Sequence, residues 1–432
     1  RGSLLETLGI IIREAMPKSK STPMRKSDRR PSTKPKSKRS SVDTLEILLE
    51  LMRMPGVSCE EAPLAEFVKA ELLRAGAPGS AIRFDDAHRR TPRPGSCGNL
   101  TLKLKGTLPG PRRLLMAHLD TVPVCVGAQP VRRGDQVVSR DPRTGVGADN
   151  RAGVTVVLQA ALRLLRSSIP HPPLTFLWTV QEEIGLLGAR HARLALLGNP
   201  GLAFNWDGSL PHAVTIGATG GYRMAIEIRG IASHAGNAPE KGVSAIAIAS
   251  CAIADLHRGG WHGKVEQRGK LGTSNVGIIQ GGDATNVVTD RVTLRAEARS
   301  HDPRFRARIV EEIERSFRRA SKEIRASDGS NGSVHFEGDV DYEAFRLDAE
   351  EPCVRAAQAA VRAVGLVPEL RIANGGLDAN WLSARGIPTV TLGCGQRNPH
   401  MTTEALELPD FKNACEIAWH LATGTEHAEH GT

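Results

Sequence analysis

Histidine and carboxylate side chains follow several apolar, strand-like runs of this sequence, and together they could bind metal ions. His118 and Asp120 come after the run RRLLMA, and Asp149 lies in the glycine-rich stretch GVGADNRAG just before a helical pattern. The others follow three further apolar runs: Glu182 and Glu183 after LTFLWTV, Asp207 after AFNW, and His400 in NPHMTTE after IPTVTLG. Open α/β sheets place their sites just beyond the carboxyl ends of their strands. We therefore expect these side chains to lie together at one edge of a sheet.

The chemistry of this set is that of a two-metal hydrolytic centre. Imidazole and carboxylate groups are ligands that Zn(II) accepts without any thiolate. One Asp can bridge two metal ions, and of two adjacent acids such as Glu182 and Glu183 one can bind metal while the other moves a proton. Water between two such ions has a lowered pKa and can attack an amide. Taken singly, each residue also has a structural explanation, such as a core histidine for His118 or a turn residue for Asp149.

The elements that must position these residues alternate between helix and strand. Leucines at helical spacing predict helices over 41–54 and 64–76, and a third helix follows over 151–166. Continuous apolar runs predict buried strands, among them 99–105 and 113–117. This alternation indicates an α/β fold in which helices flank a mixed central sheet.

Between about residues 215 and 339 the pattern changes to β-α-β-β-α-β, the ferredoxin-like order. After it the chain resumes with a helix and a buried strand, so we interpret 215–339 as an insertion. The predicted organisation is a basic tail over 1–41, a first domain in two parts over 42–214 and 340–432, and a second domain inserted over 215–339.

The net charge of +10 is concentrated in the tail. Residues 1–41 carry 12 basic and three acidic side chains, so the rest of the chain is nearly neutral. We expect the tail to be disordered, because its composition cannot bury enough surface to fold. We expect it to make at most nonspecific contacts to nucleic acid, because aromatic residues, at 4% of the chain, are too scarce for base stacking. The alternative from another class is a binding protein that uses this tail on nucleic acid or on a membrane surface.

Two further features concern the compartment. No apolar run approaches the roughly 20 residues that span a bilayer, and the opening residues lack the pattern of a secretory signal. The seven cysteines are scattered, with no CxxC pair, as is typical of reduced thiols. We predict a cytoplasmic protein that does not bind membranes.

Five motifs in order, HLDTVP, GADNRAG, QEEIGLLGA, NWDG and NPHMTTE, are similar to those of the di-zinc metallopeptidases that include peptidase T, carboxypeptidase G and the aminoacylases. The resemblance covers residues 42–426, and the insertion lies between the fourth and fifth motifs. It implies two zinc ions per subunit, with cobalt or manganese as alternatives. The ligands it implies are Asp149 as the bridge, His118 and Asp207 on one zinc, and Glu183 and His400 on the other.

The same resemblance implies roles for further residues. Glu182 would be the general base, and Asp120 would orient the imidazole of His118. The residues implied to bind substrate are His234 in SHAGNAPEKG, Asn286 in DATNVVTD, Arg299 in EARSHDP, and Gly376 and Asp378 in NGGLDANWL, with Gly375 and Gly395 as further lining residues. The simpler interpretation of His234, Asn286 and Arg299 is that they are surface residues at strand ends. The resemblance also implies that 42–214 and 340–432 form the catalytic domain and that 215–339 is a lid and dimerisation domain. It implies a homodimer formed through that domain, with His234 reaching the active site across the interface to stabilise the oxyanion.

The motifs GADNRAG and QEEIGLLGA are more similar to the tripeptidase-type aminopeptidases than to deacylases. The first functional hypothesis is therefore release of the N-terminal residue from short peptides. The alternative is a carboxypeptidase or an N-acyl-amino-acid deacylase on the same scaffold, so the expected substrate is a short peptide or an N-acyl amino acid.

Overall fold

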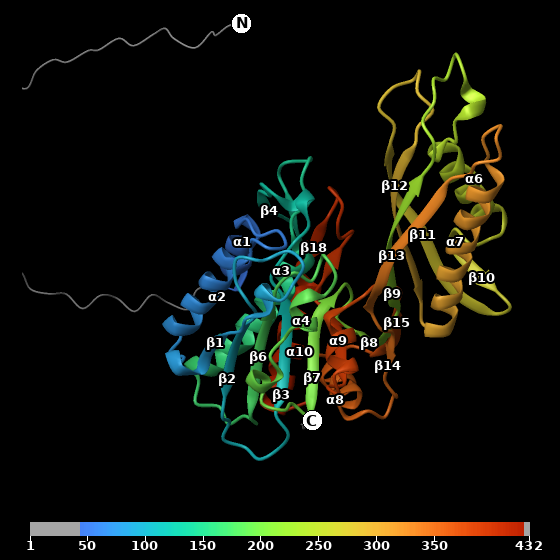
Figure 1. Ribbon diagram of the computed structural model, residues 1–432. Coiled ribbons are helices and arrows are strands. Elements are labelled where there is room, and N and C mark those ends of the chain that lie inside the picture. The colour runs from blue at the N-terminus through green and yellow to red at the C-terminus, as the bar shows by residue number, and fades with distance from the viewer. Residues whose placement is uncertain (1–43, 427–432) are drawn as a thin grey trace, which may run out of the picture. The chain divides into compact units, whose positions relative to one another are not determined.

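The larger of two main sheets has nine strands, and residues 44–426 are the part of the chain that the computed structural model describes (Figure 1). Its strands run in the order β1-β2-β6-β3-β7-β16-β8-β14, with β15 beside β8. Their bounds are β1 Ile82–Phe84, β2 Leu100–Leu104, β3 Arg113–His118, β6 Leu174–Thr179, β7 Leu202–Gly208, β8 Ala213–Ala218, β14 Phe345–Arg346, β15 Glu369–Ala373 and β16 Thr389–Gly393. Strands β6, β3, β7 and β16 are parallel neighbours, whereas the other pairs include antiparallel ones. The predicted mixed central sheet is confirmed.

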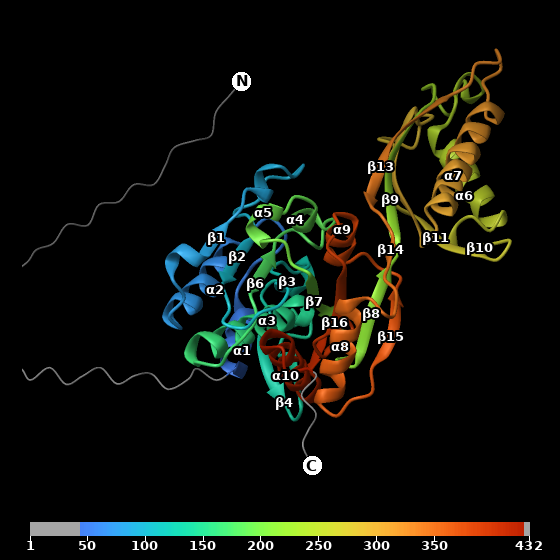
Figure 2. The ribbon, with the colours of Figure 1, turned by 90° about the horizontal axis from the view of Figure 1, so that it is seen from below.

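Helices cover both faces of this sheet, which is why its central strands are apolar throughout. They are α1 Thr44–Arg53, α2 Ala62–Arg74, α3 Ala148–Arg166, α4 Leu187–Arg190, α5 Leu194–Leu197, α8 Pro352–Ala363, α9 Asp378–Ala384 and α10 Leu408–Thr423. Figure 2 shows α4, α5 and α9 on one face and α1, α3, α8 and α10 on the other. Every residue of β6 is buried, as a strand between two helical layers requires.

A small antiparallel sheet, which the sequence patterns do not predict, joins two distant parts of the chain. It consists of β4 Pro130–Arg133, β5 Gln136–Ser139, β17 Gln396–Arg397 and β18 Ala405–Glu407, in the order β17-β18-β5-β4. The loop between β17 and β18 carries His400, so pairing of β18 with β5 anchors that loop. Short 3-10 helices occupy Gly79–Ala81, Ala87–Arg89, Pro123–Cys125 and Pro239–Lys241.

The second main sheet has five strands and its own hydrophobic core. Its elements are β9 Gly220–Arg229, α6 Ala245–Arg258, β10 Gly263–Gln267, β11 Lys270–Gly281, β12 Arg291–Ser300, α7 Pro303–Glu323 and β13 Ser333–Tyr342. The strand order is β10-β11-β12-β9-β13, and α6 and α7 pack on one face (Figure 1). Strand β10 is absent from the predicted order, because within it only Val265 is buried and the usual apolar alternation is missing. The ferredoxin-like assignment and the domain boundaries stay predictions.

Three predictions concern the chain as a whole: the basic tail, the reduced cysteines and the lack of a membrane-spanning segment. The basic tail, residues 1–41, lies outside the described residues, as do the last residues of the segment 340–432. All seven cysteines are free thiols. Within residues 44–426, no helix is both long and apolar enough to cross a membrane.

Candidate metal centre

The sheet edge formed by the carboxyl ends of β3, β6 and β7 gathers the predicted acidic and imidazole groups. His118 is the last residue of β3, Asp207 lies near the end of β7, and Glu182 and Glu183 follow β6. Because these three strands are parallel neighbours, their carboxyl ends meet. Asp149 comes to the same place at the amino end of α3. The structure therefore brings together residues from four separate motifs at this edge.

Asp149 lies between the two histidines. Its Oδ1 is 3.3 Å from Nε2 of His118, and its Oδ2 is 3.4 Å from Nε2 of His400. The Oδ1 atom is buried and accepts no hydrogen bond despite this proximity. Each carboxylate oxygen thus faces a different imidazole, which is the arrangement a bridging ligand needs.

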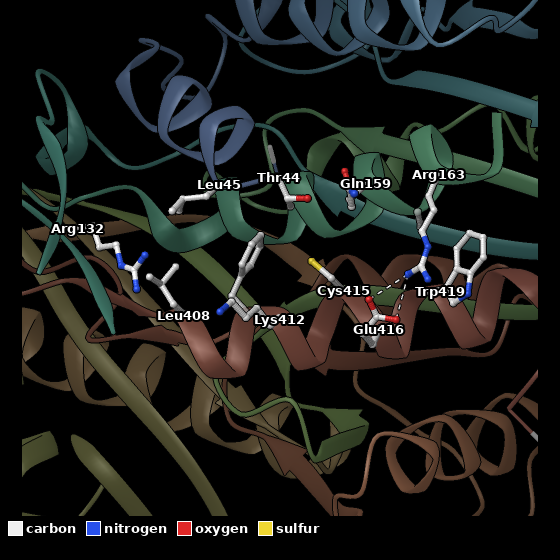
Figure 3. A pocket seen from close by; sticks show the side chains of 12 residues that line it. Thr44, Leu45, Arg132, Gln159, Arg163, Leu408, Lys412, Cys415, Glu416 and Trp419 are labelled. Atoms are coloured by element: carbon white, nitrogen blue, oxygen red, sulfur yellow. Dashed lines mark hydrogen bonds and ion pairs between the residues drawn. The ribbon is translucent and has the colours of Figure 1, made fainter. Parts of the chain in front are cut away.

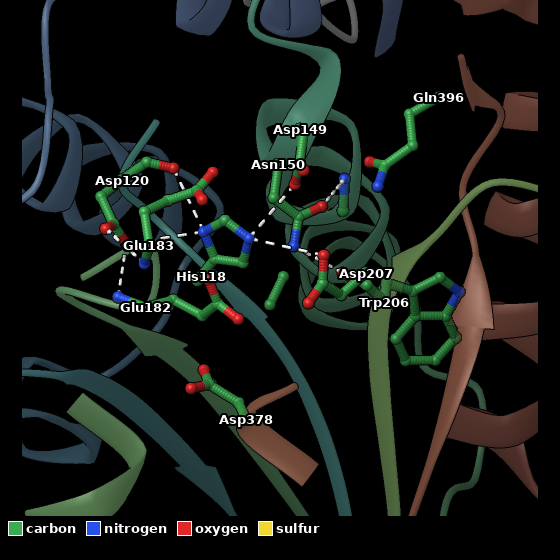
Figure 4. Close-up of polar contacts among 12 residues, drawn as sticks. His118, Asp120, Asp149, Asn150, Glu182, Glu183, Trp206, Asp207, Asp378 and Gln396 are labelled. Carbon is green, nitrogen blue, oxygen red and sulfur yellow. Dashed lines mark hydrogen bonds and ion pairs between the residues drawn. The ribbon is translucent and has the colours of Figure 1, made fainter. Parts of the chain in front are cut away.

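Two more carboxylates, Asp207 and Glu183, complete the groups around the imidazoles, and Figure 4 shows both with His118. Asp207 Oδ1 lies 3.5 Å from His118 Nε2, and Glu183 Oε2 lies 3.0 Å from His400 Nε2. Two atoms bound to one tetrahedral zinc ion, each about 2.0–2.2 Å from it, lie about 3.4 Å apart. The observed separations, from 3.0 to 3.5 Å, lie near that value, so the donor set fits a pair of divalent ions.

Glu182 lies close enough to be either a ligand or a base. Potential ligand atoms of His118, Glu182 and Asp207 lie within 4.8 Å of one another, and so do those of His118, Asp149 and Glu183. The first of these groups includes Glu182, which the sequence analysis assigns to proton transfer. Glu182 is 8% exposed, and burial raises the pKa of its carboxyl well above the ordinary value. A raised pKa suits a carboxyl that takes up and releases a proton during a reaction.

Asp120 organises the buried side of the centre. Its backbone carbonyl lies 3.1 Å from Nδ1 of His118, so Nδ1 is the donor and Nε2 is left to face the acids. Its Oδ1 accepts the N–H of Glu182 at 3.0 Å, and its Oδ2 accepts the N–H of Glu183 at 3.1 Å. The hydroxyl of Ser58 donates to Oδ2 at 2.6 Å. Asp120 therefore fixes both glutamates as well as the histidine, and the sequence analysis missed this second task and Ser58.

Burial and neighbouring charges shift the pKa values of the ionisable groups in this centre in opposite directions. Burial raises the pKa of Glu183 to about 7 and that of Asp207 to about 6. Burial also opposes ionisation of Asp149, but the neighbouring imidazoles of His118 and His400 outweigh it and lower the pKa of Asp149. The neighbouring carboxylates of Asp149 and Glu183 raise the pKa of His400 to about 10. In the absence of metal, the imidazoles keep their protons to balance the carboxylates.

The acids open into a cavity of about 540 Å³. Its lining also includes Arg299, Gly375 and Gly376, three of the residues predicted to touch substrate, and Arg223 and Tyr342, which the sequence analysis missed. A Cβ atom on Gly376 would lie 2.4 Å from Cζ of Tyr342, so glycine is required there by the tyrosine ring. The glycine pair in NGGLD was the available signal for a ring packed against it.

The M20 family matches this architecture. The model described as Peptidase family M20/M25/M40 matches residues 114–423, well over half of the chain. The chain belongs to this family. The resemblance to peptidase T and carboxypeptidase G is thereby confirmed, and the protein is a hydrolase of the metallopeptidase class.

Individual relatives of this M20 peptidase point in the same direction. It is 31% identical to the uncharacterized protein YqjE of Bacillus subtilis over 374 residues, 86% of this chain and 95% of that one. It is 26% identical to peptidase T of Brevibacillus brevis over 65% of this chain and 66% of that one. Among solved structures, a tripeptidase from Staphylococcus aureus is 28% identical with a TM-score of 0.79, and aminopeptidase PepT from Bacillus cereus is 29% identical with a TM-score of 0.74. Both alignments cover 89% of this chain and 98% of the other.

Three of the residues predicted to bind substrate do not line the acidic cavity. His234 and Asn286 are exposed in adjacent loops of the five-stranded sheet and do not line the cavity. Asp378 is 1% exposed at the start of α9, where it accepts a hydrogen bond from Thr179 beneath the centre (Figure 4). Burial raises the pKa of Asp378 to about 7. Their roles toward substrate stay predictions.

A second cavity, of about 360 Å³, lies between α1, α3 and α10 and contains none of the predicted site residues (Figure 3). Arg163 lies over the ring of Trp419 there and pairs with Glu416 at 3.0 Å. Thr44, the first described residue, also lines it. Its lining lacks the cluster of histidine and carboxylate groups that lines the acidic cavity.

Proposed function

We propose that the protein is a two-metal aminopeptidase that releases the N-terminal residue from short peptides. The observation that carries the proposal is the placing of Asp149 between His118 and His400, with Glu182 and Glu183 beside them in one open cavity. The metal ligands would be Asp149 as the bridge, His118 and Asp207 on one ion, and Glu183 and His400 on the other. Bound divalent ions supply Lewis-acid polarisation of the scissile carbonyl and a water molecule of lowered pKa.

The chain's own residues divide the remaining work. Glu182 takes a proton from the attacking water and later gives it to the leaving amine, a task suited to its raised pKa. Asp120 holds the His118 ring in the tautomer that presents Nε2 to the centre. It also fixes the backbone of Glu182, so that base and ligand keep their relative places.

Two guanidinium groups are available for a substrate carboxylate. Arg299 of β12 and Arg223 of β9 line the cavity together with the acids. Arg299 is paired with Glu297 at 3.0 Å and Arg223 with Asp341 at 3.0 Å, which holds both guanidinium groups in place. A planar guanidinium can meet a carboxylate with two hydrogen bonds. This feature suits tripeptides and equally suits the second candidate, a carboxypeptidase or N-acyl-amino-acid deacylase.

The choice between the two candidates rests on the N-terminal side of the substrate. The 28–29% identity and TM-scores above 0.7 to a tripeptidase and to PepT favour the aminopeptidase. A panel of free tripeptides, N-blocked tripeptides and N-acyl amino acids, assayed with zinc, cobalt or manganese, tests it. We expect cleavage of the free peptides alone. Preference for blocked substrates would establish the second candidate instead.

We further propose a cytoplasmic homodimer formed through the inserted domain, expected over 215–339, with His234 acting across the interface. The exposure of His234 outside the cavity of its own chain supports this. Mixing two inactive variants, His234→Ala and Glu182→Gln, tests it, because a mixed dimer contains one complete site. Return of activity on mixing is the expected result, and absence of any return after subunit exchange is verified would contradict it.

A further inference from the structure

Glu404 is a buried carboxylate that joins two loops of the proposed metal centre. It closes the motif NPHMTTE, four residues after His400, and is 2% exposed. Its Oε2 accepts the N–H of Gly147 at 2.7 Å, and its Oε1 accepts the N–H of Asp149 at 2.9 Å. The thiol of Cys125 also donates to Oε2, at 3.4 Å. One side chain thus holds the backbone on both sides of residue 148.

Glu404 holds the turn that leads into helix α3. Asp149, with φ −83° and ψ 104°, and Asn150, with φ −124° and ψ 36°, are not helical, so the regular part of α3 begins after them. The side-chain oxygen of Asn150 accepts the N–H of Gly153 at 3.1 Å and caps that part locally. Glu404 instead accepts the N–H of Asp149 itself, from 255 residues away in the sequence. The orientation of Asp149 therefore depends on a residue of the His400 loop.

The two glycines of GVGADN have separate reasons, and that of Gly145 is the contact with Glu404. A Cβ atom on Gly145 would lie 2.8 Å from Oε2 of Glu404 and 3.1 Å from Sγ of Cys125. Gly147 has a φ of 73°, a conformation that favours glycine. The sequence of this loop is thus matched to a carboxylate that approaches its backbone closely.

We propose that Glu404 is a positioning residue that sets the place of Asp149 relative to His400. It thereby determines how tightly the protein binds the metal ion that Glu183 and His400 would hold. The inference rests on the proposed function, in which Asp149 bridges the two metal ions. A role limited to holding this turn in place would affect folding stability alone. A positioning role also affects metal affinity, because mutation of a group that orients a metal ligand typically lowers the affinity for the metal 10- to 100-fold.

The test is a titration of the full-length, chelator-treated protein with Co(II), followed by visible absorption and calorimetry. The variants are Glu404→Gln, which keeps one acceptor oxygen, and Gly145→Ala, which displaces the carboxylate without removing its charge. The control is Glu407→Gln, because Glu407 lies three residues further on and bonds to Gln136 at the surface rather than to the Asp149 loop. Thermal midpoints verify that each variant is folded.

We expect one of two Co(II) sites to weaken by about 10- to 100-fold in both test variants and to keep its affinity in the control. With metal just sufficient for the wild type, kcat should fall while KM changes little. Affinities within twofold of the wild type at both sites, with only a lower thermal midpoint, would overturn the inference. A wild-type protein that binds no metal would overturn the proposed function as well. One that binds two ions and cleaves no peptide would overturn the function alone.

Discussion

The two sides of the candidate metal centre are built differently. His118 ends a buried strand, is 1% exposed, and has its ring held by Asp120. The side chain of His400 is 52% exposed and lies on a loop, with a φ of 64°. Asp149 belongs to both sides, since each of its oxygens faces one histidine. The comparison indicates that the central sheet holds one ligand set in place before metal binds, whereas the position of the other set depends on loop contacts.

The largest expected effect comes from the residue that the two sides share. Asp149→Asn should reduce both metal content and peptide hydrolysis, because it removes charge from both ligand sets at once. Loss of Lewis-acid stabilisation worth several kcal/mol corresponds to about a 10³-fold or greater fall in kcat/KM. Metal analysis by mass spectrometry and kcat/KM on a tripeptide check it. A variant that keeps two metal ions and activity within tenfold would show that Asp149 does not bridge.

Glu182 allows the chemistry to be separated from metal binding. Glu182→Gln should keep two metal ions and the wild-type KM, while kcat falls by about 10²- to 10⁴-fold because the proton acceptor is gone. Steady-state kinetics with parallel metal analysis provide the measurement. Loss of one metal ion in this variant would instead make Glu182 a ligand, as its proximity to His118 and Asp207 allows.

The difference between the two sides predicts unequal metal affinities. His400→Ala should release one ion and keep the other, because His118 and Asp207, both near strand ends, and the shared Asp149 are intact. His118→Ala should lose the tighter ion and lower the affinity of the remaining one. Competition with a chelator of known affinity gives both constants. Equal affinities in the wild type, or equal losses in the two variants, would contradict the comparison between a fixed and a loop-dependent side.

The buried side was the more predictable from sequence. Apolar runs ending in His118 and Asp207 mark central strands, and parallel strands must bring their carboxyl ends together. The exposed side was placed only through the resemblance of NPHMTTE to a family motif, since no periodic pattern positions a loop residue. The small sheet that anchors this loop pairs residues more than 250 apart in the chain, as in the contact of Leu406 with Val137, and local patterns carry no information about such pairing.

Sequence patterns also gave no indication of the network beneath the buried side. Ser58 and Glu61 lie far from the central strands in the sequence, and Glu61 is the residue just before α2, where an acid is common. In the structure its Oε1 accepts the N–H groups of Cys59 and Gln181, at 2.8 Å and 2.9 Å. These bonds hold the segment that leads into Glu182. Only tertiary packing distinguishes such a residue from a surface carboxylate.

The smallest predicted effect concerns this same Glu61, which is fully buried and whose Oε2 has no hydrogen-bond partner. Burial, with Asp120 nearby, raises the pKa of Glu61 from 4.5 to about 7. Because the folded protein holds this proton to a higher pH than the unfolded chain, the stability it contributes is present below pH 4.5 and is lost as pH rises through 7. In metal-free protein, Glu61→Gln should therefore gain about 2 kcal/mol relative to the wild type between pH 5 and pH 8. Urea unfolding of both proteins at the two pH values measures this difference, with Glu407→Gln as the control. If the difference in unfolding free energy between the two proteins does not change with pH, Glu61 is ionised throughout and paired within the buried side.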